Sequence, residues 1–77
     1  MKILNEDKYE IIVASDVSTR DGIGIEIYED GNLIIDIFRD DTKKTKEVTL
    51  FKEQISIELL EEALEIFKKE IPQNFLE

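Results

Sequence analysis

The stretch from Asp21 to Arg39 constrains the fold most, because apolar residues alternate with polar ones on both sides of a turn sequence. The alternating positions hold branched aliphatic side chains: Ile23, Ile25, Ile27, Leu33, Ile35 and Ile37. A period of two is typical of β-strands that bury one face. The segment therefore predicts two antiparallel strands joined by a tight turn.

The length of that turn decides which residues face one another. A three-residue loop over 29–31 places Ile25 opposite Ile35 and gathers all six aliphatic side chains on one face. A two-residue turn ending at Gly31 instead places Ile25 opposite Asp36, which buries a carboxylate at a cost of several kcal/mol unless it is paired. We therefore expect the three-residue loop, with Gly31 in the left-handed conformation that glycine adopts without steric penalty.

Three further segments show the pattern of regular structure. Residues 9–15 and 45–51 are rich in β-branched side chains and predict a first and a fourth strand. Ser56 is a preferred helix N-cap, and Pro72 ends a helix, so a helix is expected between them.

The apolar positions of this helix predict its buried face. The face spans about 80° of arc at roughly 100° per residue and holds Ile57, Leu60, Leu64, Phe67 and Ile71. Leu59, Ala63 and Ile66 widen the apolar arc as a flank. We expect the five-residue face to cover the six aliphatic side chains of the central strands.

The order of the elements predicts an α+β fold, in which a four-stranded antiparallel meander carries one C-terminal helix on one face (ββββα). The 77 residues form a single small domain, with residues 1–7 interpreted as an N-terminal arm and 73–77 as a C-terminal tail. One helix covers one side of such a sheet. The other side is called the outer face below.

The charge balance excludes several functions. The chain has 19 acidic and 10 basic residues, a net charge of −9, and neither histidine nor cysteine. This charge repels nucleic-acid phosphates and anionic membranes, so any charged partner is expected to be a basic protein. No apolar run reaches the length of a membrane span, and the first residues become acidic too early for a signal peptide, so we expect a cytoplasmic protein.

No motif in the chain predicts catalysis. Without histidine or cysteine there is no Ser-His or Cys-His nucleophile pair. Gly22 and Gly24 precede a strand, whereas a phosphate loop follows a strand and opens a helix. Asp36, Asp40 and Asp41 lack the spacing of a calcium loop. The sequence therefore predicts no enzyme, no cofactor and no metal site.

The basic residues have structural interpretations. Lys43, Lys44, Lys46 and Lys52 are interpreted as charges that protect an edge strand or a hairpin tip from pairing with other chains. Arg20 and Arg39 are expected to pair locally with Asp21 or Asp41, and reaching a partner is the alternative.

The outer face is the candidate binding surface, because aromatic and aliphatic side chains surrounded by charge are typical of an interface. The predicted partner-binding residues are Tyr28, Phe38 and Phe51 as anchors, Ile34 beside them, and Glu26 and Asp36 as charged contacts. Two alternatives remain open at this point. In the first, Leu59 and Ile66 cover the sheet edges, and the chain ends fold over the outer face through Ile3, Leu4, Phe75 and Leu76. In the second, a homodimer forms through the outer face or the helix flank.

The segments 20–28 and 37–41 combine into the pattern R-D-G-x-G-x-E-x-Y … I-F-R-D-D, followed by Thr49-Leu-Phe51 and a Leu-Leu-Glu-Glu helix. This pattern resembles a group of small uncharacterised bacterial proteins over about residues 9–72, and the resemblance implies no catalytic or binding residue. In composition, the chain is also similar to toxin-immunity proteins and phage anti-defence inhibitors, which block basic enzymes. The leading hypothesis is therefore a non-enzymatic acidic protein-binding module of this inhibitor type. A self-associating structural or regulatory domain is the alternative.

Overall fold

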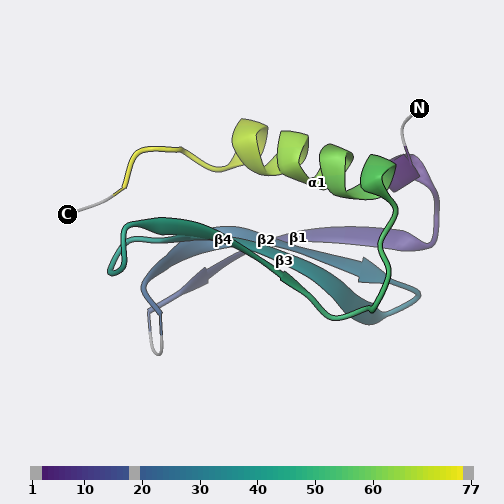
Figure 1. Cartoon of the computed structure of the whole chain (residues 1–77), viewed down its shortest axis with the longest axis horizontal. Coiled ribbons are helices and arrows are strands. Elements are labelled where there is room, and N and C mark those ends of the chain that lie inside the picture. The colour runs from purple at the N-terminus through teal and green to yellow at the C-terminus, as the bar shows by residue number, and fades with distance from the viewer. Residues whose placement is uncertain (1–2, 18–19, 76–77) are drawn as a thin grey trace.

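The computed structural model describes residues 3–17 and 20–75 of the chain. Its elements are η1 (Ile3–Asn5), β1 (Tyr9–Asp16), β2 (Gly22–Glu29), β3 (Asn32–Asp40), β4 (Thr45–Leu50) and α1 (Ile57–Glu70). The four strands form one antiparallel sheet in the order β1-β2-β3-β4, and α1 lies across one face (Figure 1). The predicted ββββα fold is confirmed.

The hairpin between β2 and β3 turns through two residues, Asp30 and Gly31, and Glu29 lies opposite Asn32. Both turn residues have positive φ, 50° at Asp30 and 84° at Gly31. This combination belongs to the type I′ turn, whose twist matches that of the strands it joins. The predicted three-residue loop is therefore wrong.

A β-bulge at Ile34 compensates for the shorter turn. The register of the two strands shifts inside the hairpin, so Ile25 lies opposite Ile37 and not opposite the predicted Ile35. Without the extra residue, a turn of this length would place Asp36 opposite Ile25. The bulge thus keeps the Asp36 carboxylate out of the core. Burial of this carboxylate was the reason for rejecting a two-residue turn.

The bulge also exchanges the faces of Leu33 and Ile34. Ile34 is 4% exposed and packs in the core cluster with Ile35. Leu33 lies opposite Tyr28 on the outer face, because directly opposed residues of antiparallel strands share a face. The predictions that Leu33 belongs to the core face and Ile34 to the outer face are therefore wrong.

The boundaries of α1 agree with the sequence. The Ser56 hydroxyl accepts a hydrogen bond from the Leu59 N–H at 3.1 Å, as expected of an N-cap. The helix ends at Glu70, ahead of Pro72, and the Ile71 N–H still donates to the Phe67 carbonyl.

The buried face of α1 is rotated relative to the prediction. Its buried side chains are Leu59, Glu62, Ala63 and Phe67. Phe67 and Ile71 of the predicted face are buried as expected, but Ile57 is 69% exposed, and Leu60 and Leu64 are half-buried. Leu59 and Ala63, which were predicted to lie on the flank, are thus at the centre of the contact between helix and sheet. In this orientation the small Ala63 side chain faces the sheet and the Glu62 carboxylate reaches the backbone of η1.

Glu62 fastens the start of the chain to the helix. Its carboxylate accepts hydrogen bonds from the backbone N–H of Ile3 and, at 3.1 Å, from that of Leu4. The Leu4 side chain is buried in the core cluster. Residues 3–5 therefore form part of the helix side of the sheet and not a separate arm.

The other chain end follows the same side of the sheet (Figure 1). The ring of Phe75 is half-buried, and the Lys46 amine lies 5.5 Å from its centre. Neither described end covers the outer face, so that alternative is wrong for Ile3, Leu4 and Phe75. Leu76 lies outside the described residues.

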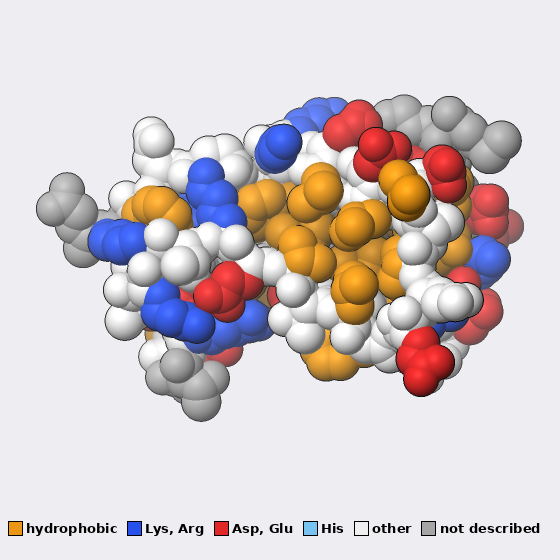
Figure 2. Space-filling model, in the orientation of Figure 1, with side chains coloured by type: hydrophobic (Ala, Val, Ile, Leu, Met, Phe, Trp, Pro, Cys, Tyr) orange, Lys and Arg blue, Asp and Glu red, His pale blue; other side chains and the backbone are white. Residues whose placement is uncertain are grey.

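Helix α1 packs over the two central strands, β2 and β3, and leaves both edge strands uncovered. Val48 and Leu50 of β4 lie opposite core residues of β3, yet they are 44% and 46% exposed. Figure 2 shows the apolar side chains that gather between the helix and this edge. On β1, Ile11 and Val13 occupy equivalent positions opposite core residues and are also exposed.

Arg39 is buried between β3 and the segment that follows α1. Its guanidinium makes two contacts with the Asp41 carboxylate, Nε to Oδ1 at 3.0 Å and Nη2 to Oδ2 at 3.1 Å. Nη1 donates to the Pro72 carbonyl at 2.6 Å. The predicted pairing of Arg39 with Asp41 is confirmed, and it ties the end of the helix to the sheet.

Candidate protein-binding surfaces

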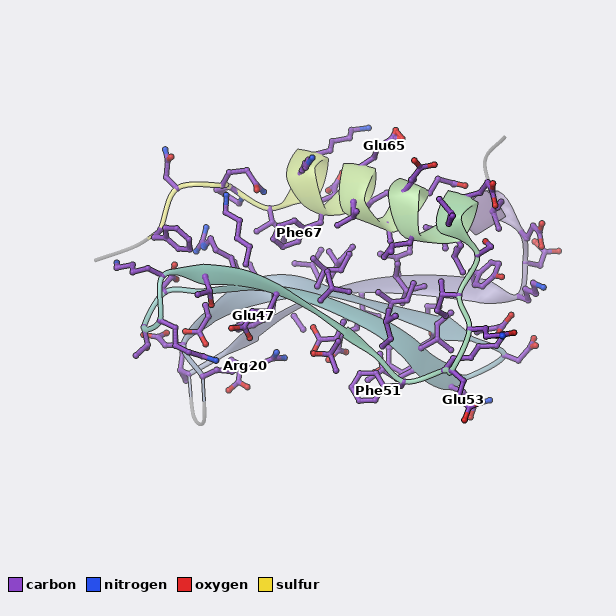
Figure 3. All side chains as sticks on the ribbon, viewed as in Figure 1. Arg20, Glu47, Phe51, Glu53, Glu65 and Phe67 are labelled. Carbon is purple, nitrogen blue, oxygen red and sulfur yellow. The ribbon has the colours of Figure 1, made fainter. Side chains whose placement is uncertain are left out.

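The outer face is a continuous surface formed by one side of all four strands. Figure 3 shows Arg20, Glu47 and Phe51 on this side of the sheet, whereas Phe67 points from α1 into the core. The apolar side chains that remain accessible on the outer face are Ile12, Tyr28, Leu33 and Phe51. Carboxylates from all four strands surround them: Glu10, Glu26, Asp36 and Glu47.

Arg20 covers the aromatic ring of Phe38. The guanidinium carbon lies 3.7 Å from the ring centre, and Nη2 donates to Asp36 Oδ2 at 2.8 Å. Nε lies 3.6 Å from the Asp16 carboxylate. Arg20 therefore combines a cation–π contact with two ion pairs. The prediction that Arg20 pairs with Asp21 or Asp41 is wrong, because its partners are Asp36 and Asp16.

The glycines of β2 allow β3 to approach closely beneath this cluster. A Cβ atom at Gly24 would lie 2.1 Å from the Ile37 carbonyl oxygen, and one at Gly22 would lie 1.9 Å from the Arg39 carbonyl oxygen. Both distances are far shorter than a carbon–oxygen contact, so neither position accepts a side chain. The close approach of the strands also lets the ring of Phe38 lie across β2 near Gly22.

Tyr28 and Glu26 form a polar pair on β2, toward the end of the outer face that carries the β2–β3 turn. The Tyr28 hydroxyl donates to Glu26 Oε1 at 3.0 Å. This hydrogen bond to the carboxylate, with desolvation and the nearby charges of Glu10 and Asp36, raises the pKa of the Tyr28 phenol above its ordinary value. The ring of Tyr28 thus sits among negative charges and remains neutral at physiological pH.

Glu47 marks the β4 side of the outer face. Its carboxylate accepts a hydrogen bond from the Thr45 hydroxyl at 2.8 Å and lies 3.1 Å from the Lys43 amine. These two partners lower the pKa of Glu47, so the carboxylate stays charged into the acidic range. Phe51 follows directly after β4 and is 55% exposed.

The six predicted binding residues therefore fall into four groups. Ile34 is in the core, and Phe38 and Asp36 are 3% and 7% exposed beneath Arg20. Tyr28 and Glu26 are half-buried, and Phe51 is the one anchor of the six that is largely exposed. The sequence analysis did not predict that Arg20 covers Phe38. The signal available in the sequence was the position of Arg20 four residues after Asp16, with which it forms an ion pair.

Two hollows accompany these surfaces. The first, of about 100 Å³, lies on the outer face and is lined by Ala14, Ser15, Asp16, Arg20, Gly24, Glu26, Asp36 and Phe38. The second, of about 350 Å³, is lined by Val17, Ile23 and Pro72 beside the Arg39–Asp41 pair. Arg39 and Asp41 neutralise each other there, and Asp21 adds one further carboxylate to walls that are otherwise mainly apolar.

Within residues 3–17 and 20–75, no three carboxylates come together in a group that could hold a metal ion. No helix in that part of the chain has the length and apolar character needed to cross a membrane. The fold and these surfaces define the chain as a small α+β domain with an antiparallel sheet. Comparisons with protein-family models, with curated proteins and with solved structures found no match.

Proposed function

We propose that the chain is a non-enzymatic protein-binding domain that engages a basic partner through its outer face. One observation carries the proposal: within residues 3–17 and 20–75, no helix or chain end covers the face opposite α1, and this face combines accessible aromatic side chains with carboxylates from every strand. Tyrosine and phenylalanine are enriched at protein interfaces, and complementary charges direct the approach of the partner.

The anchors of this surface are Tyr28 and Phe51. Phe51 offers the larger exposed area, and Tyr28 offers a ring edge beside the Glu26 carboxylate. A partner that buries both rings would remove apolar area from water at the end of the outer face nearest the β2–β3 turn. We therefore assign the binding energy to these two rings and the orientation of the partner to the surrounding carboxylates.

The Arg20 cluster indicates the chemistry that the outer face favours. A guanidinium stacked on an aromatic ring and paired with a carboxylate is already present, formed by the chain's own Arg20 on Phe38 and Asp36. An arginine of the partner placed against Tyr28 and Glu26 would meet the same combination of ring and charge. A basic partner fits this face better than an acidic or neutral one.

Inhibitors and immunity-type antagonists of basic enzymes work in this way, by placing carboxylates and aromatic rings over a positively charged site. The proposal includes that role, with the cytoplasm as the place of action because the cysteine-free chain needs no oxidising compartment. It assigns no catalytic step to the chain: Asp36 is engaged by Arg20, and Glu26 accepts from Tyr28.

A titration with an arginine-rich peptide, followed by NMR, tests the proposal. We expect shifts centred on Tyr28 and Phe51, and Phe51→Ala to weaken binding roughly tenfold. Ile57→Ala is the matched control, because Ile57 is similarly exposed but lies on α1. Equal affinity for both variants, or shifts centred on the helix, would contradict the proposal, because net charge alone would then explain the binding. Added salt should weaken the complex steeply.

A further inference from the structure

The first strand presents an open backbone edge. β1 is an outer strand of the sheet, and within residues 3–17 and 20–75 its one partner strand is β2. The Asp30 N–H donates to the Lys8 carbonyl, and hydrogen-bonded residues alternate along an antiparallel pair. Even-numbered residues of β1 therefore direct their backbone groups toward β2, and Ile11 and Val13 direct theirs outward.

The side chains beside this edge are apolar on both faces of the sheet. Ile11 and Val13, on the helix side, are 37% and 51% exposed, and Ile12, on the outer face, is 38% exposed. Eight residues without proline or an interior lysine form this strand. Natural edge strands usually carry such residues to prevent pairing with other chains, so β1 lacks the usual protection.

The sequence of β1 is complementary to itself in one antiparallel register. When a second copy pairs about a two-fold axis at Ile12, Ile11 lies opposite Val13 of the other copy on the helix side. The same register brings Lys8 opposite Asp16, so opposite charges meet at both ends of the strand pair.

The neighbouring registers are penalised by charge. Centring the axis on Ile11 places Glu6 opposite Asp16, and centring it on Val13 places Glu10 opposite Asp16. Each brings two carboxylates together at both ends of the pair. Registers that place an odd-numbered residue opposite an even-numbered one are excluded, because only the odd-numbered residues of β1 direct their backbone N–H and C=O groups toward the second copy.

We propose that the chain forms a homodimer through β1, in which two antiparallel β1 strands centred on Ile12 join both sheets into one of eight strands. The two-fold axis is perpendicular to the sheet, so both helices lie on one side and both outer faces lie on the other. This inference is independent of the proposed function, which uses Tyr28 and Phe51 rather than the edge. If both hold, the dimer presents two acidic surfaces side by side and gains avidity for a partner with two sites.

Sedimentation equilibrium tests the association. We expect the mass to rise to twice that of one chain over roughly a hundredfold range of concentration. Ile12→Lys places like charges at the axis and should abolish the rise, whereas Val48→Lys, a similarly exposed valine on β4, should leave it unchanged. A monomer at all concentrations, or equal loss in both variants, would overturn the proposal. Circular dichroism of each variant verifies that it is folded.

Cysteine scanning tests the register. The chain has no cysteine, so one introduced thiol forms a disulfide only between copies. Ile12 of two copies would form a non-hydrogen-bonded pair, with Cα atoms about 4.5 Å apart, which a disulfide can bridge. With oxidised glutathione, the Ile12→Cys variant should cross-link at least about tenfold faster than Ile11→Cys or Val13→Cys. Val48→Cys on β4 is the control. Fastest cross-linking in any of these other variants would refute the register.

Discussion

The two edges of the sheet are built alike and protected differently. β1 and β4 both flank the core, and both expose aliphatic side chains on the helix side, with Val13 51% and Val48 44% exposed. β1 has no charge between Glu10 and Asp16, whereas β4 contains Lys46 and is flanked by Lys43, Lys44 and Lys52.

These charges disfavour self-pairing of β4 in its three central registers. The Phe51 N–H donates to the Ile34 carbonyl, so even-numbered residues of β4 direct their backbone groups outward. An axis at Glu47 would place that carboxylate opposite itself. Centring on Val48 or Thr49 would bring Lys52 opposite another lysine, Lys44 or Lys46 respectively. The difference between the edges therefore lies in charge and not in shape.

The largest effect is expected from proline at neighbouring positions of β1. Ile12→Pro removes an N–H that faces β2 and should lower the free energy of unfolding by about 2–3 kcal/mol. Val13→Pro removes an outward N–H and should cost about 1 kcal/mol or less. Urea denaturation at low protein concentration measures both. Equal costs would mean that the outward edge of β1 is already bonded.

The next largest effect concerns the hydrogen bonds from η1 to Glu62, which hold the segment before β1 against the helix. Glu62→Ala leaves the backbone N–H groups of Ile3 and Leu4 without their acceptor and should cost about 1–3 kcal/mol. Glu65→Ala is the control, because Glu65 points away from the sheet (Figure 3), and its cost should stay within about 0.5 kcal/mol. Hydrogen exchange should show that Glu62→Ala loosens β1 more than β4. Uniform loosening of both strands would contradict a local anchor.

Removing the charges of β4 should change association more than stability. Replacing Lys46 by valine and Glu47 by isoleucine changes an exposed and a half-buried residue, so stability should shift by about 1 kcal/mol or less. The chain would then have two self-pairing edges, and open-ended sheets should form because pairing no longer closes at a dimer. Light scattering detects them. An unchanged dimer would show that charge does not protect β4.

The smallest effect is the acid dependence of stability. The pKa of Glu47 is lowered by the Thr45 hydroxyl and Lys43, and the pKa of Glu29 is lowered mainly by the hydrogen bond from Lys52. A lowered pKa stabilises the fold above the ordinary value of 4.5, and this contribution is lost as the pH falls through the lowered pKa.

Melting temperatures of Glu47→Gln and Glu29→Gln should therefore lie slightly below that of the original chain at neutral pH and converge with it in acid. A difference in melting temperature that grows as the pH falls would contradict the sign of both pKa shifts.

The sequence predicted the elements of the fold well, because the two-residue period, the Ser56 cap and Pro72 are local signals. It predicted the hairpin register wrongly, because the choice of turn and the bulge at Ile34 compensate for each other. Only their combination keeps Asp36 out of the core, and no single residue reveals it. The same bulge moved one predicted binding residue into the core and brought Leu33 to the outer face.

The helix rotation and the cover over Phe38 depend on contacts between distant residues. Glu62 is an acidic residue in an acidic helix, and its role as an acceptor for the backbone of η1 appears only when residues 59 positions apart meet. Arg20 reaches Phe38 across the outer face. The open edge of β1, by contrast, was present in the sequence as an unprotected strand beside a turn, although strand order was needed to place it at an edge.

Amide hydrogen exchange measured by NMR as a function of protein concentration tests the difference between the edges most directly. The outward amides of Ile11 and Val13 should exchange rapidly in dilute solution and become protected as concentration rises. Those of Lys46 and Val48 should exchange rapidly throughout. Protection that appears on β4 instead, or amides of β1 that exchange equally fast at every concentration, would contradict the account.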